Sequence, residues 1–346
     1  NLIVKKINHK NIRIHLKNQN IKKIYNSFKK TLNKSCSNER IAAAISGGPD
    51  SLALAFFLKC YSLENKLNVK FVHVNHNLRK FSNNEAKLLK SKLKDFGIKI
   101  EIINWLGTKP KKNIQSIARK KRYNLILKNI AKSKIKNLLI GHTEEDLIEN
   151  FFIRLFRGSG LQGFVSFTNK TVKFGKFQII RPLINIKKKE LIFITNKVFG
   201  FYISDPSNLE DKYTRVKIRK IINELLKENL SMSKIILSLK NLNHSNQAVN
   251  YYVNQNISLN SSYQVSKKLF ILKKIFFDQP DEIILRSLNI ILRKINKNYY
   301  PPRGKKVMNL INIIKEEKNR KFTISSCIIE KLQNSYIIYG EKQKKN

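Results

Sequence analysis

Short apolar segments alternate with longer segments of helical periodicity from residue 41 to about residue 156. Apolar runs bounded by turn residues favour buried strands, and strands separated by helices favour a parallel sheet. The predicted strands are 41–45, 69–75, 98–105 and 136–142, and the predicted helices are 51–62, 82–96, 113–132 and 143–156. We therefore predict an α/β domain with helices on both faces of its sheet. Ligands of such sheets bind at the carboxyl ends of the strands.

The alternation ends after about residue 157. Further predicted elements are a hairpin at 174–183, a helix at 187–199, mainly helical chain at 216–256, helices at 280–296 and 304–318, and two short strands at 320–327 and 335–341. The length suits two domains. We expect a basic, short ordered lead-in at 1–37, the parallel-sheet domain at 38–215, and a basic, mainly helical α+β domain at 216–346.

The chain carries a large positive charge, with 69 Lys and Arg against 23 Asp and Glu and a formal net charge of +46. Part of this excess is typical of an AT-rich genome, but its sign indicates a polyanionic partner, and RNA is the candidate. The three cysteines form no CxxC pair, which disfavours disulfide or metal-cluster chemistry. No apolar run approaches the roughly 20 residues of a membrane span, so no membrane partner is expected.

The stretch SGGPDS, Ser46 to Ser51, directly follows the first predicted strand and opens a helix. Two glycines let anionic oxygens approach the main chain, and the helix directs free N–H groups at the same place. Asp50 would repel a phosphate unless a divalent cation lay between them, which indicates Mg²⁺. A tight turn with Asp50 as a helix cap is the competing interpretation. The loop lacks the Gly-Lys-Ser/Thr of a Walker motif.

SGGPDS resembles the pyrophosphatase loop of the N-type ATP pyrophosphatases, the PP-loop family with a Rossmann-like sheet. Five further stretches extend the resemblance, over about residues 38 to 220, to the tRNA(Ile)-lysidine synthases. They are HVNHNLR (73–79), IARKKRY (117–123), GHTEEDLIENFFIRLFRGSG (141–160), RPL (181–183) and DPSN (205–208).

The resemblance implies a ligase that uses ATP and Mg²⁺. In that family ATP adenylates the wobble cytidine of a minor isoleucine tRNA with a CAU anticodon, and free L-lysine displaces AMP. The product, lysidine, changes codon reading from AUG to AUA. Partners would be this tRNA and L-lysine, and a homodimer is left open. The AT-biased composition favours the plastid stroma, with a bacterial cytoplasm as the alternative.

The resemblance also assigns roles to individual residues. ATP binding is carried over to Ser46, Gly47, Gly48, Pro49, Asp50 and Ser51, magnesium binding to Asp50 and Asp146, and catalysis to Asp50, Asp146 and Glu145. The family usually has two aspartates where this chain has Glu145 and Asp146. The chain departs again at Asn75, Asn77 and Asn150 and in RVKIR at 215–219. A carboxylate role at position 75 is therefore not expected.

Other charged residues are candidates for substrate contacts. Glu145, Asp146 and Glu149 lie within about one and a half turns of a predicted helix and suit the two amines of lysine. Acids at a helix start also suit its dipole, which is the competing interpretation. Arg119 and Arg122, at i and i+3, are candidates for ATP or tRNA phosphates. Arg157, before Gly-Ser-Gly, is a further candidate for tRNA phosphate.

Two other functions remain open at this point. A tRNA thiolation enzyme of the same ATP pyrophosphatase family would use the same loop, although it needs reactive cysteines or a cluster. A non-catalytic RNA-binding protein with a relic loop would explain the positive charge and the departures at Asn75 and Glu145.

Overall fold

The fold is taken from a computed structural model of the chain. It describes residues 12–36, 39–77, 81–107, 114–168, 171–204, 214–296, 302, 304–316 and 321–341. The chain divides into two compact units, the first ending at Lys240 and the second beginning at Asn241. Arg79 and the DPSN stretch lie outside the described residues.

The first unit is built on a six-stranded sheet in the order β3-β2-β1-β4-β6-β5. Its strands are β1 (Ile41–Ala44), β2 (Val69–Asn75), β3 (Ile100–Asn104), β4 (Asn137–Ile140), β5 (Thr171–Phe174) and β6 (Phe177–Ile180). All neighbours pair in parallel except β5 and β6, which form the predicted hairpin. The predicted α/β parallel-sheet class is confirmed.

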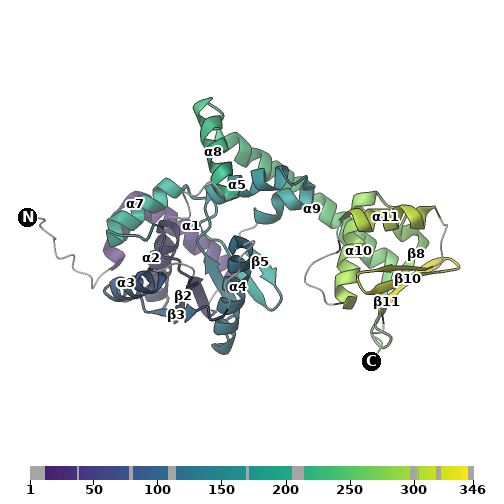
Figure 1. Cartoon of the computed structure of the whole chain (residues 1–346), viewed down its shortest axis with the longest axis horizontal. Coiled ribbons are helices and arrows are strands. Elements are labelled where there is room, and N and C mark those ends of the chain that lie inside the picture. Colours follow the sequence, from purple (N-terminus) through teal and green to yellow (C-terminus); the bar gives the residue numbers. More distant parts are fainter. Residues whose placement is uncertain are drawn as a thin grey trace, which may run out of the picture. The chain divides into compact units, whose positions relative to one another are not determined.

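Helices cover both faces of this sheet (Figure 1). The covering helices are α1 (Gln19–Cys36), α2 (Pro49–Glu64), α3 (Ser82–Lys94), α4 (Ile114–Lys132) and α7 (Lys188–Phe199). The unit also contains α5 (Glu144–Leu155), α6 (Leu161–Phe164) and α8 (Thr214–Lys227). Residues of α1, α2, α3 and α7 form one core with Ala43 and Phe71 of the sheet. Residues of α4 form a smaller core with Ala42 and Val72, because alternate strand residues face opposite sides.

Helix α1 is part of the first unit's core although it falls in the region expected as a lead-in. Ile21, Phe28 and Leu32 recur at helical spacing and are fully buried. The basic residues between them, such as Lys22 and Lys30, are exposed on the opposite face. The positive charge of this segment is therefore the solvent face of an amphipathic helix.

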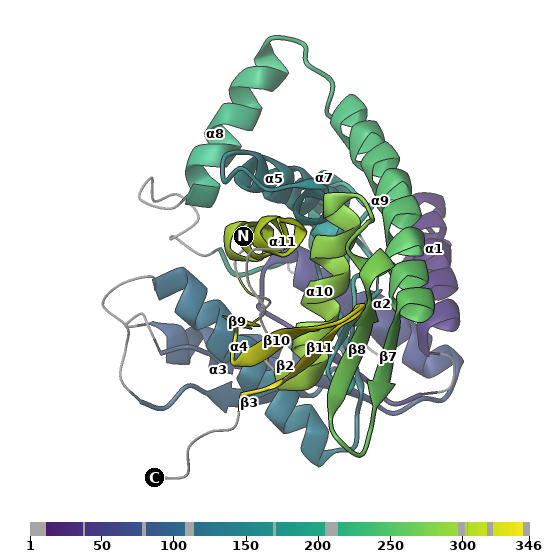
Figure 2. The ribbon, with the colours of Figure 1, turned by 90° about the vertical axis from the view of Figure 1, so that its right-hand side faces the viewer.

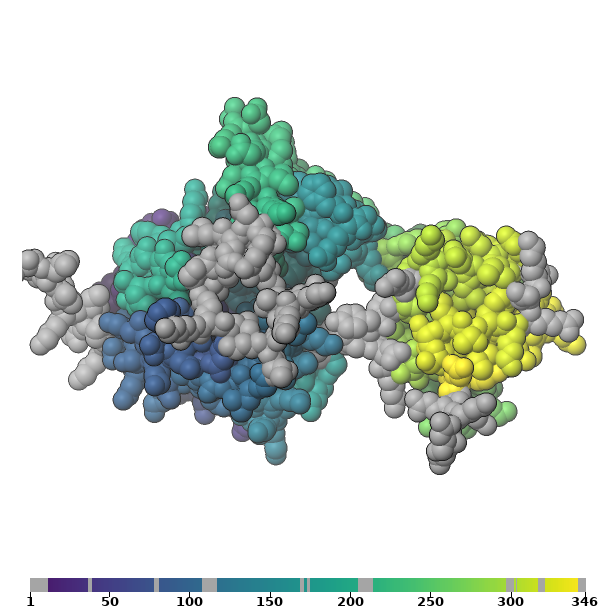
Figure 3. Space-filling view, viewed as in Figure 1, coloured from purple at the N-terminus to yellow at the C-terminus, as the bar shows by residue number. Residues whose placement is uncertain are grey.

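The division between the units lies further along the chain than the boundary expected near residue 215. Helix α8 packs against α5 and projects from the surface of the first unit (Figure 3). Helix α9 (Met232–Asn260) then continues across the division without a break. Ile235, Ile236 and Leu239 of α9 pack with Leu147 of α5 in the first unit. A continuous helix carries no local sign of a boundary, so composition could not place it.

The second unit combines a five-stranded antiparallel sheet with helices (Figure 2). The order β7-β8-β11-β10-β9 is formed by β7 (Ser261–Gln264), β8 (Leu269–Lys273), β9 (Lys321–Ile324), β10 (Cys327–Leu332) and β11 (Ser335–Gly340). Helices α10 (Asp281–Asn296) and α11 (Gly304–Lys315) bury their apolar faces against it. The α+β class is confirmed.

Three of these five strands, β7, β8 and β10, are absent from the predicted elements, which include only two strands in this region. The expected strand at 320–327 breaks at Ser325 and Ser326, both with positive φ, so β9 and β10 form a hairpin. Such turns usually carry Asn or Gly, and two serines give no local signal. The hairpin of β7 and β8 is also absent from the predicted elements, because Ser-Ser-Tyr-Gln has little strand character. Among the described residues, no helix has the length and apolar character to cross a bilayer.

Candidate active site

The loop from Ser46 to Ser51 joins the end of β1 to the start of α2. Gly47 has φ +95°, and a Cβ there would lie 2.9 Å from Cδ1 of Ile203. The N–H of Ile203 donates to the carbonyl oxygen of Gly47 at 2.9 Å. Glycine is therefore required at this position by both its backbone angle and its neighbour. Gly48 is the N-cap of α2 and Pro49 its first residue.

The hydroxyl of Ser51 organises this loop from inside. It accepts hydrogen bonds from the N–H groups of Ser46 and Gly47, both at 3.1 Å, and donates to the carbonyl oxygen of Gly48 at 2.9 Å. Ser46 Oγ lies 3.1 Å from the same hydroxyl. A phosphate group approaching these N–H groups would share or displace the Ser51 hydroxyl.

Asp50, in the first turn of α2, has a carboxylate oxygen with no hydrogen-bond partner among the described residues. Its Oδ1 atom is buried. Burial raises the pKa of Asp50 to about 7, the charge of Lys188 opposes this rise, and the charges of Asp146 and Glu145 add to it. A buried carboxylate oxygen without a donor, beside other carboxylates, fits a divalent cation, which would stabilise the ionised form.

The carboxylates available here suit Mg²⁺ more than a metal that needs an all-protein ligand set. No group of three or more His, Cys, Asp or Glu in the described part of the chain could hold a metal ion. Mg²⁺ commonly uses one or two carboxylates and takes its remaining ligands from phosphates and water. Asp50 and Asp146 fit that requirement.

Gly141, directly after β4, brings the third sequence cluster against the loop. A Cβ at Gly141 would lie 2.9 Å from the backbone oxygen of Asp50 and 3.2 Å from the nitrogen of Ser51. The ends of β1 and β4 pair directly in the sheet. The close backbone approach at Gly141 therefore places the start of α5 beside the start of α2.

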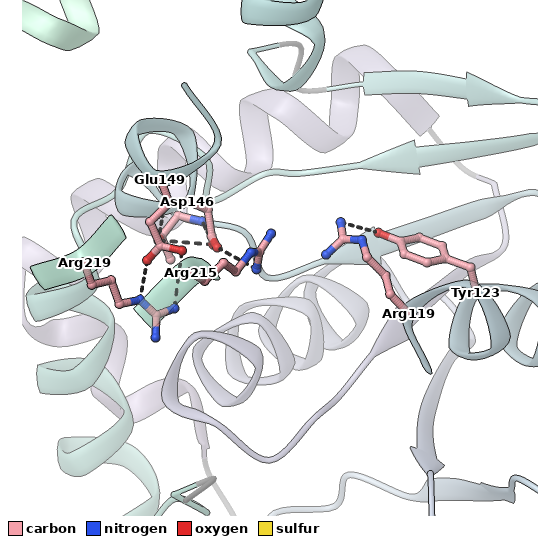
Figure 4. Close-up of polar contacts among 7 residues, drawn as sticks. Arg119, Tyr123, Asp146, Glu149, Arg215 and Arg219 are labelled. Atoms are coloured by element: carbon pink, nitrogen blue, oxygen red, sulfur yellow. Dashed lines mark hydrogen bonds and ion pairs between the residues drawn. The ribbon is translucent and has the colours of Figure 1, made fainter. Parts of the chain in front are cut away.

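Asp146 is held at the start of α5 by a capping box. Its Oδ2 accepts from the N–H of Thr143 at 2.9 Å, and its own N–H donates to Oγ1 of Thr143 at 3.5 Å. Its Oδ1 lies 4.0 Å from Nη1 of Arg215 on α8. One oxygen of Asp146 thus orients the helix, and the other lies near Arg215 (Figure 4).

Glu145 points to a different neighbour. Both of its carboxylate oxygens lie 2.9 Å from the N–H of Lys188, the first residue of α7. Its negative charge therefore lies at the positive end of the α7 dipole. The prediction of a catalytic role for Glu145 stays a prediction, and its contacts are those of a residue that joins α5 to α7.

Glu149, one turn further along α5, is paired with Arg219 of α8. Nε of Arg219 donates to Oε1 of Glu149 at 2.5 Å, and the glutamate side chain is 6% exposed. Burial lowers the pKa of Arg219, but its hydrogen bond to Glu149 and the charges of Glu149, Asp146 and Asp50 outweigh that effect and raise it. Glu149 is thus a buried carboxylate already neutralised by an arginine.

The charges of four arginines reach the buried His142, which follows Gly141. Burial lowers the pKa of His142 well below its usual value, and the charges of Arg119, Arg181, Arg215 and Arg122 lower it further. The imidazole is therefore neutral near pH 7. The arginines come from α4, the end of β6 and α8, so separate segments gather positive charge at the carboxyl edge of the sheet.

The predicted Arg119 and Arg122 belong to this arginine group, and the predicted Arg157 does not. Arg119 donates to the hydroxyl of Tyr123 at 3.4 Å and lies over its ring. In Figure 4 the guanidinium groups of Arg119 and Arg215 face one another. Arg157 is exposed beyond the far end of α5, a helix of 12 residues and roughly 18 Å, whereas Glu145 and Asp146 lie at its start.

Asn75 and Asn77, in the second cluster, have structural partners. The side chain of the buried Asn75 donates to Oδ1 of Asn83 at 2.6 Å and accepts from the N–H of Asn77 at 3.1 Å. Asn77 adopts a positive φ, which Asn tolerates better than most residues. The side-chain amide of Asn75 acts in this turn as both donor and acceptor, whereas an ionised carboxylate could only accept.

Comparison with known proteins identifies the family. The PP-loop domain family matches residues 16–226. A tRNA(Ile)-lysidine synthase of Wolbachia pipientis wMel is 31% identical over 323 residues, which cover 92% of this chain and 74% of the relative. That of Rickettsia bellii (strain OSU 85-389) is 32% identical over 334 residues, 93% of this chain and 75% of the relative. The chain belongs to the tRNA(Ile)-lysidine synthase family.

Membership of the tRNA(Ile)-lysidine synthase family makes this chain one of a group of ATP-using ligases, as the sequence resemblance implied. The matched range begins in front of α1 and ends within α8, which agrees with the place of both helices in the first unit. The solved tRNA thiolase NcsA of Methanococcus maripaludis shares the fold, with a TM-score of 0.55, 22% identity, and coverage of 65% of this chain and 79% of that chain.

Site residues that the sequence does not single out come from distant segments. Arg215 and Arg219 stand out in the sequence only as part of RVKIR, and Arg181 only as part of RPL. His142 lies inside the 141–160 stretch but has no role assigned there, and Lys188 lies outside every quoted stretch. Spacing along the chain could not assign any of these residues to its partner in the site.

Proposed function

We propose that this chain ligates L-lysine to the wobble cytidine of a tRNA(Ile) with a CAU anticodon, with ATP converted to AMP and pyrophosphate. The observation that supports this best is the meeting, at the ends of β1 and β4, of the SGGPDS loop, the carboxylates of Asp50 and Asp146, and a group of arginines. Such a site holds a polyphosphate at one side and an amine at the other.

In the first half-reaction the oxygen at position 2 of the cytidine attacks the α-phosphorus of ATP, and pyrophosphate leaves. The backbone N–H groups at Ser46 and Gly47 and the start of α2 receive the departing anion. Arg119 and Arg122 add positive charge where negative charge develops. Asp50 and Asp146 would hold Mg²⁺, which, when bound, offsets the charge of the leaving pyrophosphate.

In the second half-reaction the ε-amine of lysine forms a bond to the ring carbon that carries the adenylated oxygen. The bond between that carbon and the oxygen breaks, AMP leaves with the oxygen, and the amine loses protons. We propose that Asp146 attracts the amine, because its side chain is 17% exposed whereas that of Glu149 is 6% exposed. Glu149 contributes through Arg219, whose guanidinium it holds in place.

The cysteines do not favour the thiolation alternative. Cys36, Cys60 and Cys327 are buried and lie in separate parts of the chain. Burial raises the pKa of Cys36 and Cys60 to about 12 and that of Cys327 to about 11, so none is poised as a thiolate. The AT-biased composition supports a plastid stroma, although the two relatives named above are bacterial.

The proposal is tested by incubating the full chain with a CAU-anticodon tRNA(Ile) transcript, ATP and radiolabelled lysine. We expect label in the RNA and AMP with pyrophosphate as products. Asp146→Asn should remove the label, and Asp278→Asn, an exposed aspartate of the second unit, is the matched control. Formation of ADP and phosphate, or full incorporation by Asp146→Asn, would contradict the proposal.

A further inference from the structure

A charged depression lies at the amino edge of the sheet, where the parallel strands begin. It is a groove of about 820 Å³, and we call it the amino-edge groove. It is lined by Arg40, Asn68, Val69, Lys70, Phe71, Lys90, Lys94, Lys99, Ile100, Glu101, Ser133 and Ile135. These residues precede β1, begin β2 and β3, end α3 and precede β4. The groove is therefore separate from the SGGPDS loop, which follows the other end of β1.

The groove carries five cations and one carboxylate, and that carboxylate is already neutralised. Glu101 pairs with Lys70 at 2.8 Å, and a hydrogen bond from Lys70 lowers the pKa of Glu101 while burial opposes it. Lys70 also donates to Oγ of Ser133 at 3.0 Å, and Arg40 donates to the carbonyl oxygen of Ser133 at 3.3 Å. In this part of the groove the polar groups are thus joined to one another by hydrogen bonds and an ion pair.

The opposite wall presents lysines without partners. Lys90, Lys94 and Lys99 are exposed and make no hydrogen bond or ion pair with the described residues. Lys90 and Lys94 lie at i and i+4 on α3, where like charges repel. Lys94 also lies in the last turn, where a cation suits the helix dipole, but that effect does not extend to Lys99, which directly precedes β3. A bound anion would neutralise these neighbouring positive charges.

The floor of the groove determines which kind of anion fits. It is apolar, formed by Val69, Phe71, Ile100 and Ile135, and so offers few groups that could read the edge of a base. No helix among the described residues begins here to cradle a terminal phosphate, since α3 ends beside the groove. Spaced, flexible ammonium groups over an apolar floor suit successive phosphates of a nucleic-acid backbone, without sequence readout.

We propose that the amino-edge groove binds the phosphate backbone of the RNA substrate, at a place distant from the reacting cytidine. The inference rests on the proposed function for the identity of the RNA. The groove makes sequence-independent contacts that hold the tRNA while the carboxyl edge carries out the chemistry. It therefore contributes to RNA affinity and not to the catalytic step.

The test is the salt dependence of RNA binding by the triple variant Lys90→Ala, Lys94→Ala, Lys99→Ala. The full chain binds a fluorescent tRNA(Ile) transcript, and anisotropy gives Kd over a series of KCl concentrations, without ATP or lysine. We expect Kd to rise roughly tenfold and the slope of log Kd against log salt to fall by about 2 to 3, because each phosphate that is no longer neutralised removes roughly 0.7–0.9 from the slope.

The matched control removes three exposed lysines of α1, Lys22, Lys30 and Lys34. It should keep the wild-type slope. An equal loss in both triple variants would mean that any lysine removal weakens binding, and an unchanged Kd in the groove variant would mean that RNA does not contact it. Either result overturns the inference. The variant Lys90→Arg, Lys94→Arg, Lys99→Arg keeps the three charges and should keep the wild-type slope of log Kd against log salt.

Two further measurements separate this inference from the proposed function. With saturating tRNA the groove variant should keep the wild-type kcat for whatever product the chain forms, while KM for tRNA rises. The native cysteines are all buried, so Lys94→Cys offers a single exposed thiol for a photocrosslinker. Crosslinking to tRNA that is competed by unlabelled tRNA supports the groove even if lysine ligation fails, and crosslinking only to free nucleotide contradicts it.

Discussion

The two edges of the parallel sheet carry similar positive charge in different surroundings. At the carboxyl edge the cations are mostly arginines, and Asp50, Asp146 and Glu149 lie among them. At the amino edge they are mostly exposed lysines around one paired carboxylate. Partly buried arginines with carboxylates hold a fixed geometry, whereas exposed lysines supply adaptable charge. Burial and partners, rather than the number of charges, separate a site for chemistry from a surface for binding.

The largest expected effect is the loss of activity in Asp50→Asn. The buried oxygen of Asp50 has no donor in the described structure, so it is available to a cation, which would stabilise the ionised form. We expect AMP formation to fall about a thousandfold, a size typical of removing one essential electrostatic group. A stopped assay for AMP measures this, and RNA affinity should be unchanged. A comparable loss of kcat in the amino-edge triple variant would break the contrast between the edges.

Matched ion pairs at the two edges should differ in their contribution to stability. Arg219→Met leaves the buried Glu149 unpaired and should lower the free energy of unfolding by about 3 kcal/mol. Lys70→Met leaves Glu101, whose side chain is 47% exposed, and should cost under about 1 kcal/mol. Urea unfolding measures both. The double variant Arg219→Met, Glu149→Gln should recover part of the loss, and equal costs at both edges would argue against burial as the cause.

Gly141→Ala tests the close contact that joins β4 to the loop. Its Cβ would lie 2.9 Å from the backbone oxygen of Asp50, so α2 or α5 must shift. We expect a loss of about 1–2 kcal/mol in stability, as for other overpacked sites, together with reduced AMP formation. Thermal unfolding gives the first value. Gly304→Ala, where a Cβ meets nothing within 4 Å, serves as the control and should leave both unchanged.

A pH dependence of stability should come from Asp50. Its pKa is about 7 in the folded chain, against an ordinary value of 3.8. Between these values the folded state binds more protons than the unfolded state, so stability rises as pH falls from 7 toward 4. Relative to Asp50→Asn, the wild type should gain roughly 3 kcal/mol over that range. A parallel pH profile for the two proteins would show that Asp50 is not buried enough to titrate differently.

Local patterns predicted the parallel sheet and the loop because their causes are local. Alternating apolar strands and helices recur within segments short enough to show a period, and the positive φ of Gly47 follows from the turn after β1. The place of α1 in the core was not predicted, because its basic face outweighed its apolar stripe in composition. The strands β7, β8 and β10 were not predicted either, because Ser-Ser-Tyr-Gln has little strand character and the turn at Ser325 and Ser326 gives no local signal.

The sequence by itself determined the family, the place of the SGGPDS loop at a strand end, and the grouping of acids on α5, since each depends on residues close in the chain. Only the tertiary structure decided which carboxylate has which partner. Glu145 meets the N–H of Lys188, Glu149 meets Arg219, and Oδ1 of Asp50 meets no donor among the described residues. These partners are 43 and 70 residues apart in the chain. Distance and burial between such segments arise only when helices pack, and they set the charge of each group.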